Sequence, residues 1–305
     1  MKRWLIAIAL GLVVVPAFEL GLEAREAALV RQSSTMMHLD ASYVRYSRTS
    51  GHNQRPLVVL LNGFSGAIEQ WAYAVPVLST NFRVLAYDRV GLGFSDAVEH
   101  GVRAQSTELL ALLDSLGEHG PLLLVGFSHS ASLARLLAAE HPDRVAGLAL
   151  VAPYLPEIEN KDIPSRRSGI RTYGRLVLSS MASCLFGMRR VRERFAPVER
   201  DSVRHQVQVI NRRFWHWKSN LDEILAFEET GRIVMASPPL VRPVVLLKGP
   251  ISSRYGTAYA AAIRDVVGRA SDARVVLLPN VAHGEEINDT TSLRVLNATL
   301  LSLAL

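Results

Sequence analysis

Short, nearly all-apolar runs recur along the chain, and each of them ends at a turn. They are Leu57–Leu61, Phe82–Tyr87, Leu122–Val125, Val145–Val151, Val244–Leu247 and Val275–Leu278. Stretches with leucines at helical spacing, such as Gln105–Leu116 and Ser132–Glu140, lie between them. Apolar strands that alternate with amphipathic helices predict an α/β fold, with a mostly parallel sheet covered by helices on both faces. In such sheets the reactive groups lie in the loops at the carboxyl ends of the strands, so a site is expected there.

The alternation is interrupted between residues 154 and 240, where basic helical stretches and Trp215 and Trp217 occur without a convincing strand. We interpret this segment as an inserted helical cap that lies over the strand ends and shapes a substrate pocket. The core of the fold then consists of two parts, residues 39–153 and residues 241–305.

The N-terminus has the pattern of a targeting segment. Lys2 and Arg3 precede an apolar stretch that extends, with one acidic interruption, from Trp4 to Leu22. A basic segment followed by an apolar one is typical of signal peptides, and this one is close to the roughly 20 residues that a spanning helix needs. We expect residues 1–22 to be a membrane anchor or a cleaved signal, and residues 23–38 to form a stalk. The charge bias would place the domain outside the cytoplasm, either membrane-anchored or, after cleavage, secreted.

The chain is basic, with a formal net charge of +6 and a pI of about 9.7, and its arginines gather between Lys161 and Lys218. Because no zinc-finger spacing, RNP-like run or recognition-helix pattern occurs, we expect no nucleic-acid partner. We interpret the arginines as a solvated face of helices, with an anionic lipid surface as the alternative. The single cysteine, Cys184, excludes an intramolecular disulfide and a Cys-based metal site.

The strongest local motif is Gly126–Ser130, which directly follows an apolar strand and directly precedes a helix. This is the setting of a nucleophile elbow of the form G-x-S-x-G, in which a tight turn lifts a serine hydroxyl above the sheet. The N-terminus of the following helix then offers N–H groups to a developing oxyanion. Ser128 is the predicted nucleophile, and Ser130 stands where the motif has its final glycine. The alternative is that Ser128 only caps an ordinary helix.

Several motifs together resemble the α/β-hydrolase superfamily in their order and spacing. They are Asn62-Gly63-Phe64, Trp71, Tyr87–Asp96, Gly126–Ser130, His141–Val145 and Val281–His283. The resemblance runs from about Asp40 to the C-terminus and is weak in the cap. It is closest to bacterial members that carry an N-terminal membrane segment.

The resemblance implies roles for individual residues. In this family the catalytic base follows the last strand, where this chain has His283. The oxyanion hole is formed by the backbone N–H groups of His129 and of Phe64, which lies in the loop after the first core strand. Asn62 stands where relatives often have a structural histidine. The resemblance implies no cofactor and no metal.

The acid of the triad is the departure from the family pattern. Relatives place it after the fifth predicted strand, where Lys248–Ser253 contains no carboxylate, or after the fourth, where Ala152 and Pro153 stand instead. The nearest downstream acid is Glu157, which we predict as the third catalytic residue, followed by Glu159. The remaining alternative is that the triad has no acid, which would cost about four powers of ten in turnover.

The predicted function is hydrolysis of a small or medium carboxylic ester, or a related acyl bond, through an acyl-Ser128 intermediate with His283 as the base. Its partner would be a small-molecule, ester-like substrate. Halide and epoxide chemistry in this fold uses an aspartate nucleophile, so Ser128 argues against both, whereas a peptidase would share the serine mechanism. The alternative is a hydrolase-like binding protein with a degraded triad, which the missing acid, Ser130 and Asn62 favour.

Overall fold

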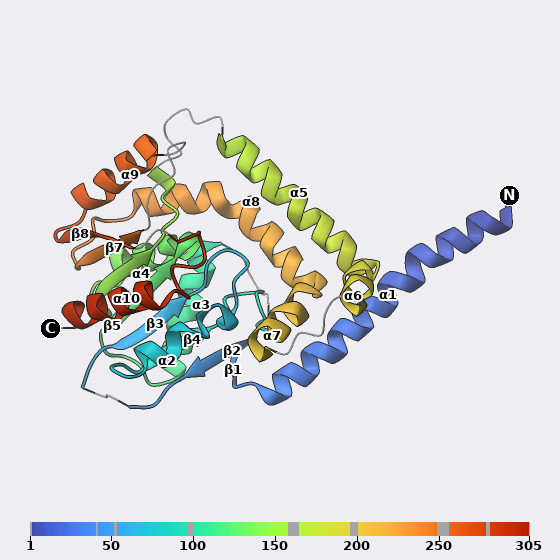
Figure 1. Ribbon diagram of the computed structural model, residues 1–305, viewed down its shortest axis with the longest axis horizontal. Helices are drawn as coiled ribbons and strands as arrows, with labels where there is room; N and C mark the ends of the chain where they lie inside the picture. The colour runs from blue at the N-terminus through green and yellow to red at the C-terminus, as the bar shows by residue number, and fades with distance from the viewer. Residues whose placement is uncertain are drawn as a thin grey trace.

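The computed structural model describes residues 2–40, 42–51, 54–96, 101–157, 165–195, 201–248, 256–278 and 281–304. Its centre is an eight-stranded sheet with the strand order β1-β2-β4-β3-β5-β6-β7-β8 (Figure 1). In that order the strands are β1 (Met36–Leu39), β2 (Ser42–Arg48), β4 (Val84–Tyr87), β3 (Leu57–Leu61), β5 (Leu122–Phe127), β6 (Val145–Val151), β7 (Val244–Lys248) and β8 (Ala273–Leu277).

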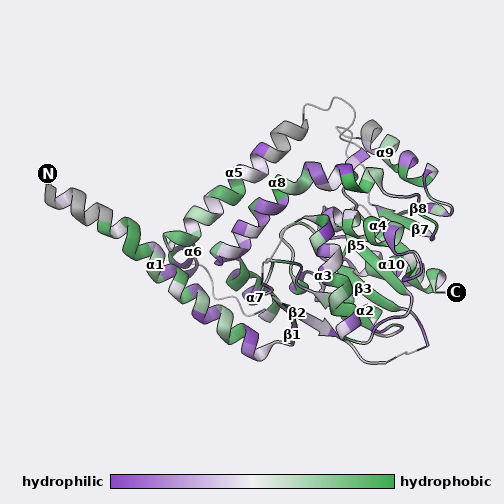
Figure 2. Ribbon diagram, turned by 180° about the vertical axis from the view of Figure 1, so that it is seen from behind, coloured by the Kyte–Doolittle hydropathy of each residue, from purple (hydrophilic) through white to green (hydrophobic). Residues whose placement is uncertain are grey.

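All six predicted strands are present and pair in parallel, while β1 and β2 add an antiparallel hairpin at one edge. The prediction of a mostly parallel α/β sheet is therefore confirmed. Because neighbouring residues of a strand point to opposite faces, Val59 of β3 belongs to one apolar layer and Leu60 to the other. Figure 2 shows the apolar strands enclosed by helices.

Helices cover both faces of the sheet. The first apolar layer is completed by α3 (Val102–Ser115), α4 (Ala131–Glu140) and α9 (Gly256–Gly268). The second is completed by α2 (Ala74–Leu78) and α10 (Thr290–Leu303). Burying the strands on both faces explains why they are apolar without alternation.

Between β6 and β7 the described part of the chain is mostly helical. The helices are α5 (Ser165–Leu185), α6 (Met188–Arg194), α7 (Ser202–Asn211) and α8 (Phe214–Ala236), and they form the predicted inserted helical region. Helix α8 packs against α5 on one side and against α4 of the core on the other. Cys184 lies in the small core of this region with Val177, Trp217 and Ile224, and burial raises the pKa of its thiol to about 11.

The long helix α1 (Lys2–Ser33) begins far from the sheet, and its second half lies along the helical region (Figure 1). There Arg190 of α6 pairs with Glu19 at 2.7 Å and with Glu26 at 2.6 Å. Arg31 donates from Nε to the Phe94 carbonyl at 3.0 Å. Residues 23–33, predicted as a stalk, are therefore packed against the domain.

The predicted membrane anchor is not supported. None of the helices in the described ranges combines the length and the apolar character that crossing a membrane requires. In α1, Pro16 and the acidic residues Glu19, Glu23 and Glu26 share the helix with the apolar residues. The prediction of a membrane anchor at residues 1–22 is therefore wrong.

Candidate active site

Ser128 lies at the tight turn that joins β5 to the short helical turn η2 (Ser128–Ser130) and α4. Its φ angle is 52°, in the left-handed region that costs a non-glycine residue on the order of 1–3 kcal/mol and that clusters at functional sites. A side chain on Gly126 would place its Cβ 3.0 Å from the backbone of Ala131, so the turn needs a glycine there. The predicted strand–turn–helix geometry around Ser128 is present.

The hydroxyl of Ser130, which the final glycine of the motif lacks, has a structural role. Its Oγ donates a hydrogen bond to the carbonyl of Asn62, at the end of β3. The Asn62 amide in turn donates to the carbonyl of Tyr87 at 2.8 Å and accepts from the Trp71 indole at 2.7 Å. This network fixes the ends of β3, β4 and β5 relative to one another.

His283 lies in the loop between β8 and α10 and reaches Ser128. Its Nε2 is 3.1 Å from the Ser128 Oγ, which is the distance expected between a general base and the proton it takes. The imidazole stacks on the Phe127 ring, with the two centroids 5.2 Å apart and the planes inclined by 20°. The structure therefore brings together the predicted nucleophile and the predicted base.

Of the two residues predicted as oxyanion donors, His129 belongs to the elbow itself, and Phe64 follows Gly63, on which a Cβ would lie 3.4 Å from Cβ of Ser128. The N–H of His129 belongs to the first turn of η2, where backbone donors have no partner within the helix. Within the described part of the chain, no backbone carbonyl accepts a hydrogen bond from the N–H of Phe64. The Phe64 loop is held by its neighbour Gly63, whose N–H donates to Gln70 at 2.8 Å and whose carbonyl accepts from Arg89 at 2.9 Å.

The structure does not bring the predicted acid to the base. Both oxygens of Glu157 accept from the guanidinium of Arg135, at 3.0 Å and 2.5 Å, and both side chains are buried. A buried arginine on α4 requires a counter-charge, and Glu157 supplies it. No contact between Glu157 and His283 occurs among the described residues, and Glu159 lies outside them.

Among the described residues, the carboxylate that approaches His283 is that of Glu286. Its Oε1 lies 3.8 Å from Nδ1 of His283, and its Oε2 accepts from the Gly284 N–H at 2.6 Å. Burial alone would raise the pKa of Glu286, but His283 and nearby backbone N–H groups outweigh burial and hold it below its usual range. The sequence pattern did not point to this residue, because the resemblance places the acid in the loops after the fourth and fifth predicted strands. The available signal was an acid three residues after the base.

Aromatic side chains of the helical region cover Phe64 and His129, the two residues predicted to form the oxyanion hole. The ring of His129 stacks on Phe227 of α8 at a centroid distance of 4.3 Å, and burial lowers the pKa of His129 to about 4. The ring of Phe64 contacts Phe227 and Tyr173 edge-on, at 5.8 Å and 5.9 Å between centroids. The imidazole of His129 is therefore neutral at pH 7, and these rings form an apolar wall beside the elbow.

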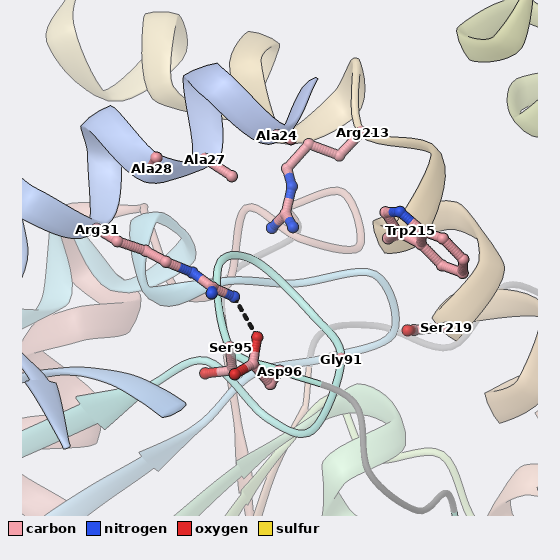
Figure 3. A pocket seen from close by; sticks show the side chains of 10 residues that line it. All are labelled: Ala24, Ala27, Ala28, Arg31, Gly91, Ser95, Asp96, Arg213, Trp215 and Ser219. Carbon is pink, nitrogen blue, oxygen red and sulfur yellow. Dashed lines mark hydrogen bonds and ion pairs between the residues drawn. The ribbon is translucent and has the colours of Figure 1, made fainter. Parts of the chain in front are cut away.

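A cavity of about 590 Å³ lies elsewhere, between α1, the loop after β4 and the start of α8 (Figure 3). Figure 3 shows Arg31 reaching across it to Asp96, with an Nη2–Oδ1 distance of 2.5 Å. None of the residues that line this cavity belongs to the elbow or to the His283 loop. Within the described ranges, no cluster of three or more histidine, cysteine or acidic side chains could hold a metal ion.

Residues 56–169 match the family model described as "alpha/beta hydrolase fold". The chain is 41% identical over 68 residues to "Putative carbamate hydrolase RutD" of Pseudomonas syringae, which is 21% of this chain and 26% of that protein. It is 36% identical over 100 residues to epoxide hydrolase B of Mycobacterium tuberculosis, which is 31% of this chain and 28% of that protein. The chain thus spans little more than a quarter of the length of either relative.

Solved structures resemble the chain over a larger share of its length. One described as "a putative epoxide hydrolase" from Pseudomonas aeruginosa gives a TM-score of 0.72 at 16% identity, over 88% of this chain and 95% of that one. Cfl2 from Burkholderia cenocepacia gives a TM-score of 0.69 at 19% identity, over 89% of this chain and 95% of that one. The family match over residues 56–169 and the likeness to these solved structures together show that the chain has the α/β-hydrolase fold.

Proposed function

We propose that the protein is a serine hydrolase that cleaves a small or medium carboxylic ester through an acyl-Ser128 intermediate. The observation that carries the proposal is the 3.1 Å contact between His283 Nε2 and Ser128 Oγ. It is supported by the backbone of Ser128, which holds a φ of 52° at the strand-to-helix turn. A nucleophile and a base within hydrogen-bond reach at such a turn have the geometry that covalent acyl transfer needs.

The chemistry follows from these positions. His283 Nε2 takes the hydroxyl proton as Ser128 Oγ attacks the ester carbonyl, and the N–H groups of Phe64 and His129 stabilise the resulting oxyanion. The imidazolium then gives that proton to the leaving alcohol. A water molecule, deprotonated by the same nitrogen, attacks the acyl group, and Ser128 regains its proton as the acid is released.

The residue at the elbow and its surroundings support an acyl substrate. A serine hydroxyl forms an acyl ester, whereas epoxide opening in this fold uses a carboxylate nucleophile, so the relatives named as epoxide hydrolases do not suggest the reaction here. A carbamate is also an acyl bond and fits the same mechanism. The wall formed by Phe64, Tyr173 and Phe227 favours an apolar acyl group over a charged one.

A fluorophosphonate probe tests the proposal, because it modifies only an activated serine. We expect labelling of the wild type, loss of labelling and of p-nitrophenyl butyrate hydrolysis in Ser128→Ala, and a strong reduction of both in His283→Ala. Ser132→Ala is the matched control, because Ser132 is a buried serine of α4 whose hydroxyl has no hydrogen-bond partner. A folded wild type that is neither labelled nor active, or an active Ser128→Ala variant, would contradict the proposed function.

A further inference from the structure

The loop that carries His283 also carries a buried acid. The Glu286 side chain is only 6% exposed, and its Oε1 faces Nδ1 of His283, the ring nitrogen opposite the one that meets Ser128. We propose that Glu286 is the positioning residue for His283, so that base and acid come from one loop. The inference rests on the proposed function and supplies the acid that neither usual position contains.

The local backbone explains why an acid three residues away can face the ring. Gly284 has a φ of 102°, a conformation that L side chains rarely adopt, and it lets the chain turn directly after His283. The Gly284 N–H then holds Oε2 of Glu286 at 2.6 Å, which leaves Oε1 directed at the imidazole. The residue that follows Glu286 is Ile287, which is fully buried and packs in the second apolar layer of the core.

The charges around Glu286 favour its ionised form. Lys248, at the end of β7, is a cation whose charge interacts with that of Glu286, and the Lys248 ammonium lies 4.7 Å from the centre of the Tyr259 ring on α9. Tyr259 donates its own hydroxyl to the Pro153 carbonyl at 2.8 Å. The strand end where relatives carry the acid therefore carries a lysine in this chain, and that lysine attracts the acid of the His283 loop.

The other nearby carboxylates are engaged differently. Glu285 is exposed and accepts from the Ala282 N–H at 3.1 Å, and Glu157 is held by Arg135. The 3.8 Å between Glu286 and His283 is longer than a hydrogen bond, and catalytic hydrogen bonds often tighten only when substrate is bound. Since 61% of the His283 side chain is exposed, the ring has room to make that small movement.

The role follows from the two ring nitrogens. An ionised Glu286 accepts the Nδ1–H of His283, which selects the tautomer whose Nε2 can take the proton from Ser128. When that proton arrives, the carboxylate stabilises the imidazolium and remains ionised itself. No bond to Glu286 forms or breaks in either half-reaction.

The test compares Glu286→Gln with Glu286→Asp and with the matched control Glu285→Gln. A glutamine can still accept from the Gly284 N–H but cannot stabilise an imidazolium, so we expect kcat to fall by about 10³- to 10⁴-fold with KM little changed. The aspartate variant keeps the charge, so its kcat should be at least tenfold higher than that of the glutamine variant. Glu285→Gln should stay within threefold of the wild type.

Two readouts separate this inference from the proposed function. The fluorophosphonate probe should still label Glu286→Gln completely, although more slowly, because Ser128 is intact. If folded Glu286→Gln keeps wild-type kcat while Ser128→Ala is inactive, Glu286 has no positioning role and the hydrolase proposal stands. If Ser128→Ala remains active, the proposed function itself fails. Should thermal unfolding show that the glutamine variant does not fold, Glu286→Met is the second variant and must show the same loss of kcat.

Discussion

His216 of α8 lies 3.1 Å, measured from its Nε2, from the Oγ of Ser65 in the loop that carries Phe64. Its Nδ1 accepts a hydrogen bond from the Gly93 N–H at 3.2 Å, so a neutral ring carries its proton on Nε2 and donates it to Ser65. The ring is completely buried and connects the helical region to the loops after β3 and β4. The position of the Phe64 loop therefore depends on a histidine that must remain uncharged.

This burial predicts a dependence of stability on pH. Burial, followed by the Arg213 charge, lowers the pKa of His216 to about 3, whereas the unfolded histidine binds a proton near pH 6.5. Between those values the unfolded state binds more protons, so His216 makes the free energy of unfolding fall by about 1.4 kcal/mol per unit as the pH drops below about 5.5. His129, with its pKa lowered by burial to about 4, acts in the same direction.

Urea unfolding of the wild type and of His216→Gln between pH 7 and pH 4.5 measures this effect. Glu108, whose pKa burial raises to about 8, acts in the opposite direction between pH 8 and pH 4.5, because the folded state keeps its proton. Glu108 is common to both proteins and cancels in the comparison. We therefore expect the free energy of unfolding to depend less steeply on pH in the variant, by the slope that one bound proton contributes. Parallel curves would show that His216 binds a proton equally in both states.

Gly63→Ala should damage catalysis although it replaces no reacting group. A Cβ on Gly63 would lie 2.8 Å from Cδ1 of the buried Phe127 ring and 3.4 Å from Cβ of Ser128. Either the Phe64 loop or the ring that supports His283 must move, and a displacement on the order of 1 Å can cost about 10²-fold in rate. We expect that loss in kcat for p-nitrophenyl butyrate. Gly120→Ala is the control, because nothing lies within 4 Å of its added Cβ, and an equal loss there would point to a general effect on folding.

The parts that were predictable from sequence are those encoded by neighbouring residues. The β5 run, the small residues around Ser128 and the helix after it define the elbow locally, and the place of His283 after the last strand follows from the order of elements. The ion pair of Glu157 with Arg135 could not be predicted, because the two residues are separated by 22 positions and no sequence motif connects them. Glu286 was missed because its approach to His283 depends on the backbone conformation of Gly284.

Glu157→Gln should therefore reduce stability and not turnover. The substitution leaves the guanidinium of Arg135 buried without its counter-charge, which costs about 3 kcal/mol in comparable cases. Chemical denaturation should show a loss of that size, and Arg135→Met/Glu157→Met should recover most of it because neither charge remains. A fall in kcat by orders of magnitude in the folded Glu157→Gln protein would instead restore Glu157 as the residue that orients His283.

The second half of α1 contributes a capping group to another helix. The Glu23 carboxylate accepts from the N–H groups of Phe214 and Trp215, at 2.9 Å and 3.4 Å, at the start of α8. The residue at the N-cap of α8, Arg213, makes no capping hydrogen bond with its side chain, and its Nε lies 3.4 Å from Glu23. Glu23 therefore supplies both an N-cap and the counter-charge for a buried arginine.

Glu23→Ala should consequently destabilise the whole domain. Loss of the cap costs about 1 kcal/mol, and leaving a buried arginine without its partner costs about 3 kcal/mol more where the charge cannot reach water. Glu26→Ala is the matched control, because Glu26 lies one turn further along α1 and pairs with the partly exposed Arg190, a type of contact worth about 1 kcal/mol or less. Urea unfolding of the three proteins at pH 7 gives the comparison. If both alanine variants lose the same small amount of unfolding free energy, α1 contributes only surface ion pairs, and Glu23 does not stabilise the N-terminus of α8.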